Sequence, residues 1–219
     1  MRRLFPNPAD EVTVRDAYDV PRLRPAGRPW VSLCMVSSLD GSIVLDENSR
    51  ALSNPVDQQV LLTLRSLADV VLVGARTVRA DGYGPPRADG PRFVVVSRTA
   101  SFTFEERFWD SDRAVLLLPE DGPDVPVPCI RAGRGTPDLA AALAGLEADL
   151  VLSEGGATLN GLLTAGDLVD ELNLTLSPQM AGGDGSRLTR GAPEGSRPMR
   201  LVHLLEDDGF VFSRYVRAR

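Results

Sequence analysis

The sequence predicts an α/β protein of three layers, in which a mostly parallel central sheet lies between two layers of helices. Continuous apolar runs of strand length alternate with segments whose apolar residues recur at helical spacing, and this pattern is typical of a parallel sheet covered on both faces. Near the C-terminus, residues 169–177 and 210–217 instead alternate between apolar and polar, which predicts half-exposed antiparallel strands.

The elements can be assigned in order along the chain. Residues 1–29 contain five prolines and predict an irregular arm with room for one short helix, so residues 30–219 are expected to form the single folded domain. One helix follows Asn54, which can cap it, and another begins near Ala157. The remaining predicted strands occupy residues 30–37, 69–74, 92–97, 114–118 and 149–153 with a short one near 127–130, and the remaining helices occupy residues 75–80 and 136–146.

Composition argues against several kinds of partner and site. The net charge of −6 makes a nucleic acid or an anionic membrane surface an unfavourable partner. No apolar run approaches the roughly 20 residues of a membrane span, and the first residues show no signal-peptide pattern, so a cytoplasmic protein is expected. Cys34 and Cys129 form no CxxC pair, so no metal site is predicted, and the single histidine, His203, is expected to be structural or at the surface.

Two glycines separate an apolar strand from an apolar helix in DLVLSEGGATLNGLL, residues 149–163. Gly155 and Gly156 precede a helix N-terminus, where free N–H groups and the helix dipole favour an anion and the missing side chains let a phosphate approach the backbone. Gly74 stands in the same position before another helix, where Thr77 can add a hydroxyl. Two such places side by side suit a pyrophosphate; the alternative is that the glycines only allow helices to pack closely on the sheet. Neither a GxGxxG nor a Walker pattern occurs.

Charged and polar side chains also follow the predicted strands, at the ends where open parallel sheets bind ligands. Glu154 and Asp81 could form a general acid–base pair, or could cap helices and contact solvent. Ser97 and Arg98 could hold a ribose 2′-phosphate, which would favour NADP over NAD, whereas the alternative for Arg98 is a solvated side chain. Arg65 could hold a substrate phosphate or could complement the dipole of its own helix.

Six blocks of sequence stand out when the strand ends are read together: SLDG (38–41), LR (64–65), VLVGARTVRADGYG (71–84), VVVSR (94–98), SEGGATLNGLL (153–163) and DLVDELNLTLSPQMAGGDG (167–185). In this order they resemble the riboflavin-pathway pyrimidine reductases, a family that shares the dihydrofolate reductase fold. The resemblance covers residues 30–185, and residues 199–217 fit the closing antiparallel strands of that fold.

The resemblance implies roles for individual residues. Catalytic roles fall to Glu154 and Asp81, and substrate contacts fall to Ser49, Arg65, Arg87 and Glu154. Ser97 and Arg98 would reach the adenosine phosphate of NADPH. The full set of cofactor-binding residues implied is Val36, Gly74, Thr77, Asp81, Ser97, Arg98, Gly155, Gly156, Ala157, Thr158 and Leu159.

The function implied is NADPH-dependent reduction of a phosphoribosylamino-pyrimidine, of the 5-amino-6-(5-phosphoribosylamino)uracil type, to its ribityl form in riboflavin biosynthesis. Two alternatives stay open: a dihydrofolate or pterin reductase with the same cofactor, and an NADP-binding module without catalysis. Two features motivate the first alternative: Ala51, where the family often has an aromatic residue, and the segment GARTVRADGYG (74–84), which resembles one in dihydrofolate reductases. Many relatives are fused to a zinc deaminase, whose H-x-E and P-C-x-x-C signatures are absent here, so a reductase alone is expected. Relatives tend to be homodimers, and a homodimer is expected.

Overall fold

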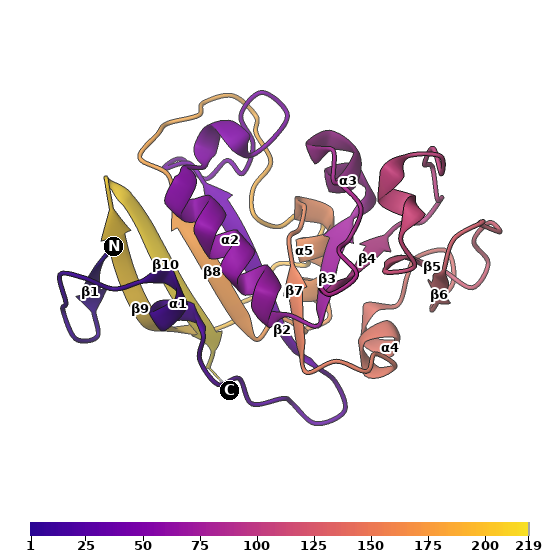
Figure 1. Cartoon of the computed structure of the whole chain (residues 1–219), viewed down its shortest axis with the longest axis horizontal. Coiled ribbons are helices and arrows are strands. Elements are labelled where there is room, and N and C mark those ends of the chain that lie inside the picture. The colour runs from indigo at the N-terminus through magenta and orange to yellow at the C-terminus, as the bar shows by residue number, and fades with distance from the viewer. Residues whose placement is uncertain (219) are drawn as a thin grey trace.

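Ten strands in the described part of the chain form one mixed sheet in the order β1-β9-β10-β8-β2-β7-β3-β4-β5-β6. The structure is a computed structural model that describes residues 1–218 (Figure 1). All neighbours from β8 to β6 run parallel, whereas β1, β9, β10 and β8 pair antiparallel, so the predicted arrangement of the sheet is confirmed. The strands are β1 (Arg2–Phe5), β2 (Trp30–Ser37), β3 (Val70–Gly74), β4 (Arg92–Val96), β5 (Ala114–Leu118), β6 (Cys129–Arg131), β7 (Leu150–Ser153), β8 (Glu171–Leu176), β9 (Met199–Asp207) and β10 (Phe210–Arg217).

Helices cover both faces of this sheet. One face carries α1 (Val14–Tyr18), α2 (Pro55–Leu67), α3 (Ala75–Asp81) and the short η2 (Arg107–Asp110), and the other carries α4 (Leu139–Ala144) and α5 (Ala157–Ala165). A further turn, η1 (Arg50–Leu52), lies between β2 and α2. In Figure 1, α1 and α2 lie in front of the sheet. Among residues 1–218, no helix is long and apolar enough to cross a membrane.

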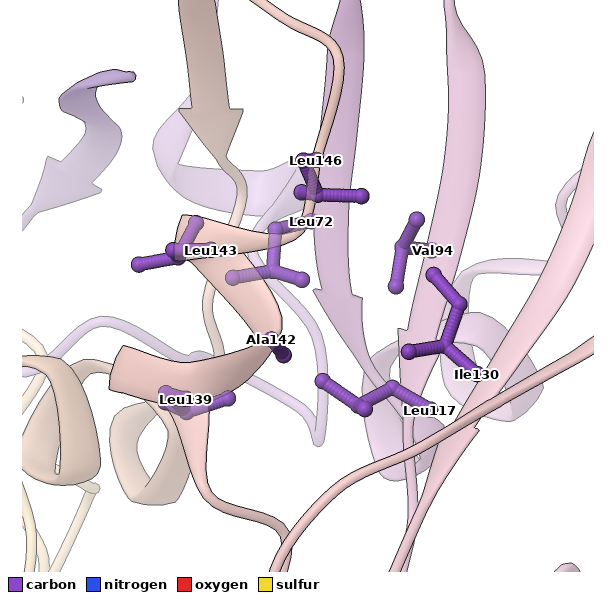
Figure 2. Close-up of a pocket in the computed structure, with 8 residues that line it drawn as sticks. All are labelled: Leu72, Val94, Leu117, Ile130, Leu139, Ala142, Leu143 and Leu146. Carbon is purple, nitrogen blue, oxygen red and sulfur yellow. The ribbon is translucent and has the colours of Figure 1, made fainter. Parts of the chain in front are cut away.

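The apolar strand residues alternate between the two faces and build the core. Leu72, Val94 and Leu117 point from neighbouring strands toward Leu139 and Leu143 of α4 (Figure 2). The space among these side chains has no room for a water molecule, so this is packed core rather than a ligand site. Truncating one of these leucines to alanine would cost about 2–5 kcal/mol.

Most element positions follow the sequence prediction, and the differences have local causes. The side chain of Asn54 accepts the N–H of Asp57 at 2.8 Å and caps α2 as predicted. The helix expected over residues 136–146 is wrong at both ends, since Asp138 is the N-cap and Gly145 the C-cap. The short strand near residues 127–130 is displaced to β6.

The N-terminal segment contains α1, the one short helix for which the prediction left room, and the strand β1, which was not predicted. Two arginines of this segment reach consecutive acids at the start of β8: Arg28 pairs with Asp170, and Arg22 pairs with Glu171. Glu171 also pairs with Arg214 of β10, and its side chain is fully buried. The segment is therefore fixed to the antiparallel half of the sheet by buried ion pairs.

Candidate active site

An ion-paired carboxylate lies at the carboxyl end of β7. Glu154 directly follows this strand, and its side chain is 4% exposed. Arg65, in the last turn of α2, donates from Nε to Oε1 of Glu154 at 2.5 Å and from Nη2 to Oε2 at 2.6 Å. The hydroxyl of Tyr83, in the loop after α3, donates to Oε2 at 2.6 Å. We call Arg65, Tyr83 and Glu154 the carboxylate cluster; it joins three segments that are distant in sequence.

Both donors of the carboxylate cluster keep their protons. Burial alone would lower the pKa of Arg65, but its hydrogen bonds with Glu154 and the negative charge of Glu154 outweigh burial and raise that pKa. Burial raises the pKa of Tyr83, and the charge of Glu154 raises it further. The guanidinium carbon of Arg65 also lies 5.2 Å from the centroid of the Tyr83 ring, a cation–π arrangement. Glu154 therefore acts here as a hydrogen-bond acceptor.

The glycine pair beside Glu154 lies where the β7–α5 and β3–α3 turns meet. The N–H of Gly74 donates to the carbonyl oxygen of Gly155 at 2.7 Å, so this N–H serves the protein rather than a ligand. Gly155 has a φ of +75°, in the left-handed region that favours glycine, and the Gly155–Gly156 peptide bond is cis. A Cβ on Gly156 would lie 3.2 Å from Oγ1 of Thr77. The two turns thus approach closely and leave glycine backbone beside the threonine hydroxyl.

The start of α5 fits a phosphate of the implied nucleotide. Gly156 is the N-cap of α5, and no side chain of residues 1–218 caps the helix. The helical hydrogen bonds begin with the N–H of Asn160, which donates to the Gly156 carbonyl oxygen, so the N–H groups of Ala157, Thr158 and Leu159 have no partner within the helix. Such N–H groups and the helix dipole favour an anion. The side chain of Leu159 lies in the core, so only its backbone can serve this role.

Asp81 lies close enough to the carboxylate cluster to interact with it. Burial raises the pKa of the half-buried Asp81, the charge of Arg50 opposes this, and the charge of Glu154 adds to it. Nη2 of Arg50 donates to the backbone oxygen of Asp81 at 2.6 Å, which ties η1 to the end of α3. Ser49 is the N-cap of η1 and directly precedes Arg50. The structure therefore brings Asp81, Glu154, Ser49 and Arg65 into one region.

Ser97, Arg98 and Arg87 are less directly connected to this region. Ser97 follows β4, and its Oγ accepts the N–H of Ala100 at 3.1 Å, so the hydroxyl shapes the turn. Arg98 is exposed. Arg87 is exposed too, and its Nε lies 3.1 Å from Oδ1 of Asp89 in its own loop. No contact found among residues 1–218 joins Arg87 to the carboxylate cluster.

Sequence reasoning did not single out Tyr83 or Arg50. Tyr83 belongs to the block RADGYG and Arg50 follows Ser49, so extending the prediction to the neighbours of matched residues would have found both. Val36, a predicted cofactor residue, is buried near the carboxyl end of β2. Within residues 1–218, no group of three or more histidine, cysteine, aspartate or glutamate side chains is placed to hold a metal ion.

The model of the RibD C-terminal domain matches residues 29–210. The chain belongs to this family. A 2,5-diamino-6-ribosylamino-4(3H)-pyrimidinone 5′-phosphate reductase of Methanothermobacter thermautotrophicus is 30% identical over 181 residues, which cover 73% of this chain and 82% of that protein. The resemblance to riboflavin-biosynthesis pyrimidine reductases is thereby confirmed.

Solved structures show the same fold. A pyrimidine reductase-like protein of Corynebacterium diphtheriae aligns with a TM-score of 0.82 at 22% identity, over 95% of this chain and all of that one. The Rib7 reductase of Saccharomyces cerevisiae aligns with a TM-score of 0.72 at 19% identity, over 90% of this chain and 93% of that one. A deaminase/reductase of Thermotoga maritima aligns with a TM-score of 0.69 at 23% identity, over 87% of this chain and 57% of that longer one. The predicted dihydrofolate reductase-like fold is confirmed.

Proposed function

We propose that this RibD C-terminal domain protein reduces a phosphoribosylamino-pyrimidine with NADPH in riboflavin biosynthesis. The observation that carries the proposal is the position of the carboxylate cluster directly beside the glycine-lined start of α5. A charged group suited to a polar substrate thereby adjoins backbone N–H groups suited to a dinucleotide phosphate. The name of the Methanothermobacter relative describes a substrate of this class.

The cofactor would be held mainly by backbone. Gly155, Gly156 and the first N–H groups of α5 would hold the pyrophosphate, and Thr77 would add a hydroxyl. Ser97 and Arg98 follow β4 and would hold the adenosine 2′-phosphate, with the exposed guanidinium supplying the charge. When bound, NADPH supplies a hydride.

The residues of the chain would position the substrate and supply a proton. The overall change adds a hydride at C1′ of the sugar and a proton at the ring oxygen, and the bond between these two atoms breaks. Glu154, which already accepts three hydrogen bonds, would accept another from a substrate N–H or O–H group. Asp81 would donate the proton, because it lies beside the carboxylate cluster and burial raises its pKa.

Turnover measurements test this proposal. Purified protein is given NADPH with 5-amino-6-(5-phosphoribosylamino)uracil or with its 2,5-diamino-pyrimidinone counterpart, and the loss of the reduced-nicotinamide absorbance is followed. We expect oxidation with at least one of them, a large loss of kcat in Asp81→Asn, and a loss of kcat/KM in Glu154→Gln. Turnover of dihydrofolate in place of both ribotides would favour the pterin alternative. NADPH binding without any turnover, unaffected by either substitution, would favour a binding module.

We also propose that the protein is a homodimer that uses the open face of β8 and its neighbours. Along β8 the polar residues Glu171, Asn173 and Thr175 are buried while Leu174 and Leu176 are only half-buried, the reverse of an ordinary surface strand. The apolar cluster under α4 and α5 includes no residue of β9 or β10 among those described, so these helices leave this part of the sheet open. A second copy would cover the leucines.

Light scattering coupled to size-exclusion chromatography tests this interface. The wild type is expected at twice the mass of the 23.6 kDa chain, and Leu174→Glu at the mass of one chain. A charge on the other side of the molecule, as in Leu62→Glu on the exposed side of α2, should leave the dimer intact. A monomeric wild type, or a dimer unaffected by Leu174→Glu, would remove the proposed interface.

A further inference from the structure

Tyr83 lies in the loop after α3, directly after Gly82, which ends that helix in a left-handed conformation. Its ring is held edge-on against two other rings, with centroids 6.0 Å from Phe93 and 6.4 Å from Phe108. Arg65 lies over its face. A ring fixed on three sides directs its hydroxyl to one place, and that place is Oε2 of Glu154.

The hydrogen bonds at Glu154 are distributed unequally between its two oxygens. Among residues 1–218, Oε2 accepts from both Nη2 of Arg65 and the hydroxyl of Tyr83, whereas Oε1 accepts only from Nε of Arg65. A carboxylate oxygen has about two acceptor positions. Oε2 is therefore filled, and Oε1 keeps one position open.

We propose that Tyr83 is a positioning residue for Glu154: it fills the second acceptor position of Oε2 and leaves Oε1 as the oxygen that receives a substrate N–H or O–H group. The identity of that substrate rests on the function proposed above. With a single open acceptor, the substrate donor has one orientation relative to the glycine pair that follows Glu154.

Two further observations agree with this role. The hydroxyl of Tyr83 keeps its proton through the neutral and alkaline range, because burial and the charge of Glu154 both raise its pKa. The same hydroxyl joins the loop after α3 to the carboxylate, so the loop and the carboxylate are fixed together. Without the hydroxyl, Oε2 would gain an open position and could take a water or the substrate donor in a second orientation.

The test uses Tyr83→Phe, which keeps the ring and removes only the hydroxyl. Loss of one hydrogen bond to a charged group is expected to lower kcat/KM for the pyrimidine ribotide by about 10- to 100-fold. The Kd of NADPH and the melting temperature of Tyr83→Phe should change little.

A crystal structure of Tyr83→Phe gives a readout that does not depend on turnover. We expect a water on Oε2 or a turned carboxylate at Glu154. An unmoved carboxylate with no new partner on Oε2, or a variant with wild-type kcat/KM, would overturn the role of Tyr83. If the wild type itself turns over neither ribotide, the proposed function fails, and the crystal structure alone decides whether Tyr83 orients Glu154.

Discussion

Replacing Glu171 by glutamine should destabilise the protein strongly. The Glu171 carboxylate is fully buried and accepts hydrogen bonds from Nε and Nη2 of Arg22 at 3.0 and 2.9 Å and from Nη2 of Arg214 at 2.8 Å. Asn173 and Ser32 also donate to it, at 2.9 and 3.2 Å. Glutamine keeps the size of the side chain but removes its charge, so two buried guanidinium groups lose their counter-charge.

Two values bound the loss in the free energy of unfolding. Burial alone would raise the pKa of Glu171, but the hydrogen bonds of Arg214 and Arg22 lower it from 4.5 to about 2. At about 1.4 kcal/mol per tenfold change, this difference corresponds to roughly 3 kcal/mol of stability. Removing one partner of a buried ion pair typically costs about 3–5 kcal/mol. The two values overlap at about 3 kcal/mol, which is the loss expected at pH 7. Because the folded-state pKa is the lower one, this stabilisation is complete above pH 4.5 and is lost as the pH falls toward 2.

Urea unfolding at pH 7, followed by tryptophan fluorescence, measures this free energy. Glu206→Gln is the matched control, because its partner Arg2 is 57% exposed and such pairs contribute less than about 1 kcal/mol. If the free energy of unfolding of Glu171→Gln falls by less than about 1 kcal/mol, the buried arginines do not need the charge of Glu171, and the reasoning is refuted.

Two further substitutions test the environment of single residues. Gly155→Ala should lower the free energy of unfolding by about 1–3 kcal/mol and weaken NADPH binding. Gly155 has a φ of +75°, and its added Cβ would lie 3.1 Å from Sδ of Met35. The control is Gly27→Ala, because Gly27 has a similar φ of +77° in open space; this variant should show the backbone strain alone and keep its NADPH affinity. His203→Phe should reduce the loss of stability on acidification, because burial and the charge of Arg214 lower the pKa of His203 from 6.5 to about 4. Between these two pKa values His203 is protonated in the unfolded chain but not in the folded one. On acidification from pH 7 to pH 5, the free energy of unfolding of the variant, measured with urea, should therefore fall by about 2 kcal/mol less than that of the wild type. Identical decreases would show that the histidine titrates normally.

The parallel half of the fold was predictable because its signals are local. Strands such as β3 and β5 are continuous apolar runs, and α5 lies between the glycine pair and Gly166 as expected. β1 was not predictable, since Arg2–Phe5 shows no alternation and pairs with β9 about two hundred residues away. Its position depends on a contact that no local pattern encodes.

The candidate site was predictable as a set of strand ends but not as a geometry. Glu154 and Arg65 were both expected near the substrate, yet their direct pairing joins residues 89 positions apart. Arg87 pairs within its own loop, because Asp89 lies two residues away. Tyr83 escaped prediction because its role depends on where the ring contacts with Phe93 and Phe108 direct the hydroxyl.

The proposed function requires that the start of α5 and the turn at Gly74 together hold NADPH. Calorimetric titration of NADPH into the wild type and into Gly156→Val tests it most directly, because a side chain on Gly156 would lie against Oγ1 of Thr77 in the proposed pyrophosphate site. Gly195→Val, in an exposed loop, is the control. We predict heat of binding and thermal protection for the wild type and the control, and neither for the folded Gly156→Val variant. A well-folded wild type that shows no binding, or a Gly156→Val variant that binds NADPH as tightly, would contradict the account.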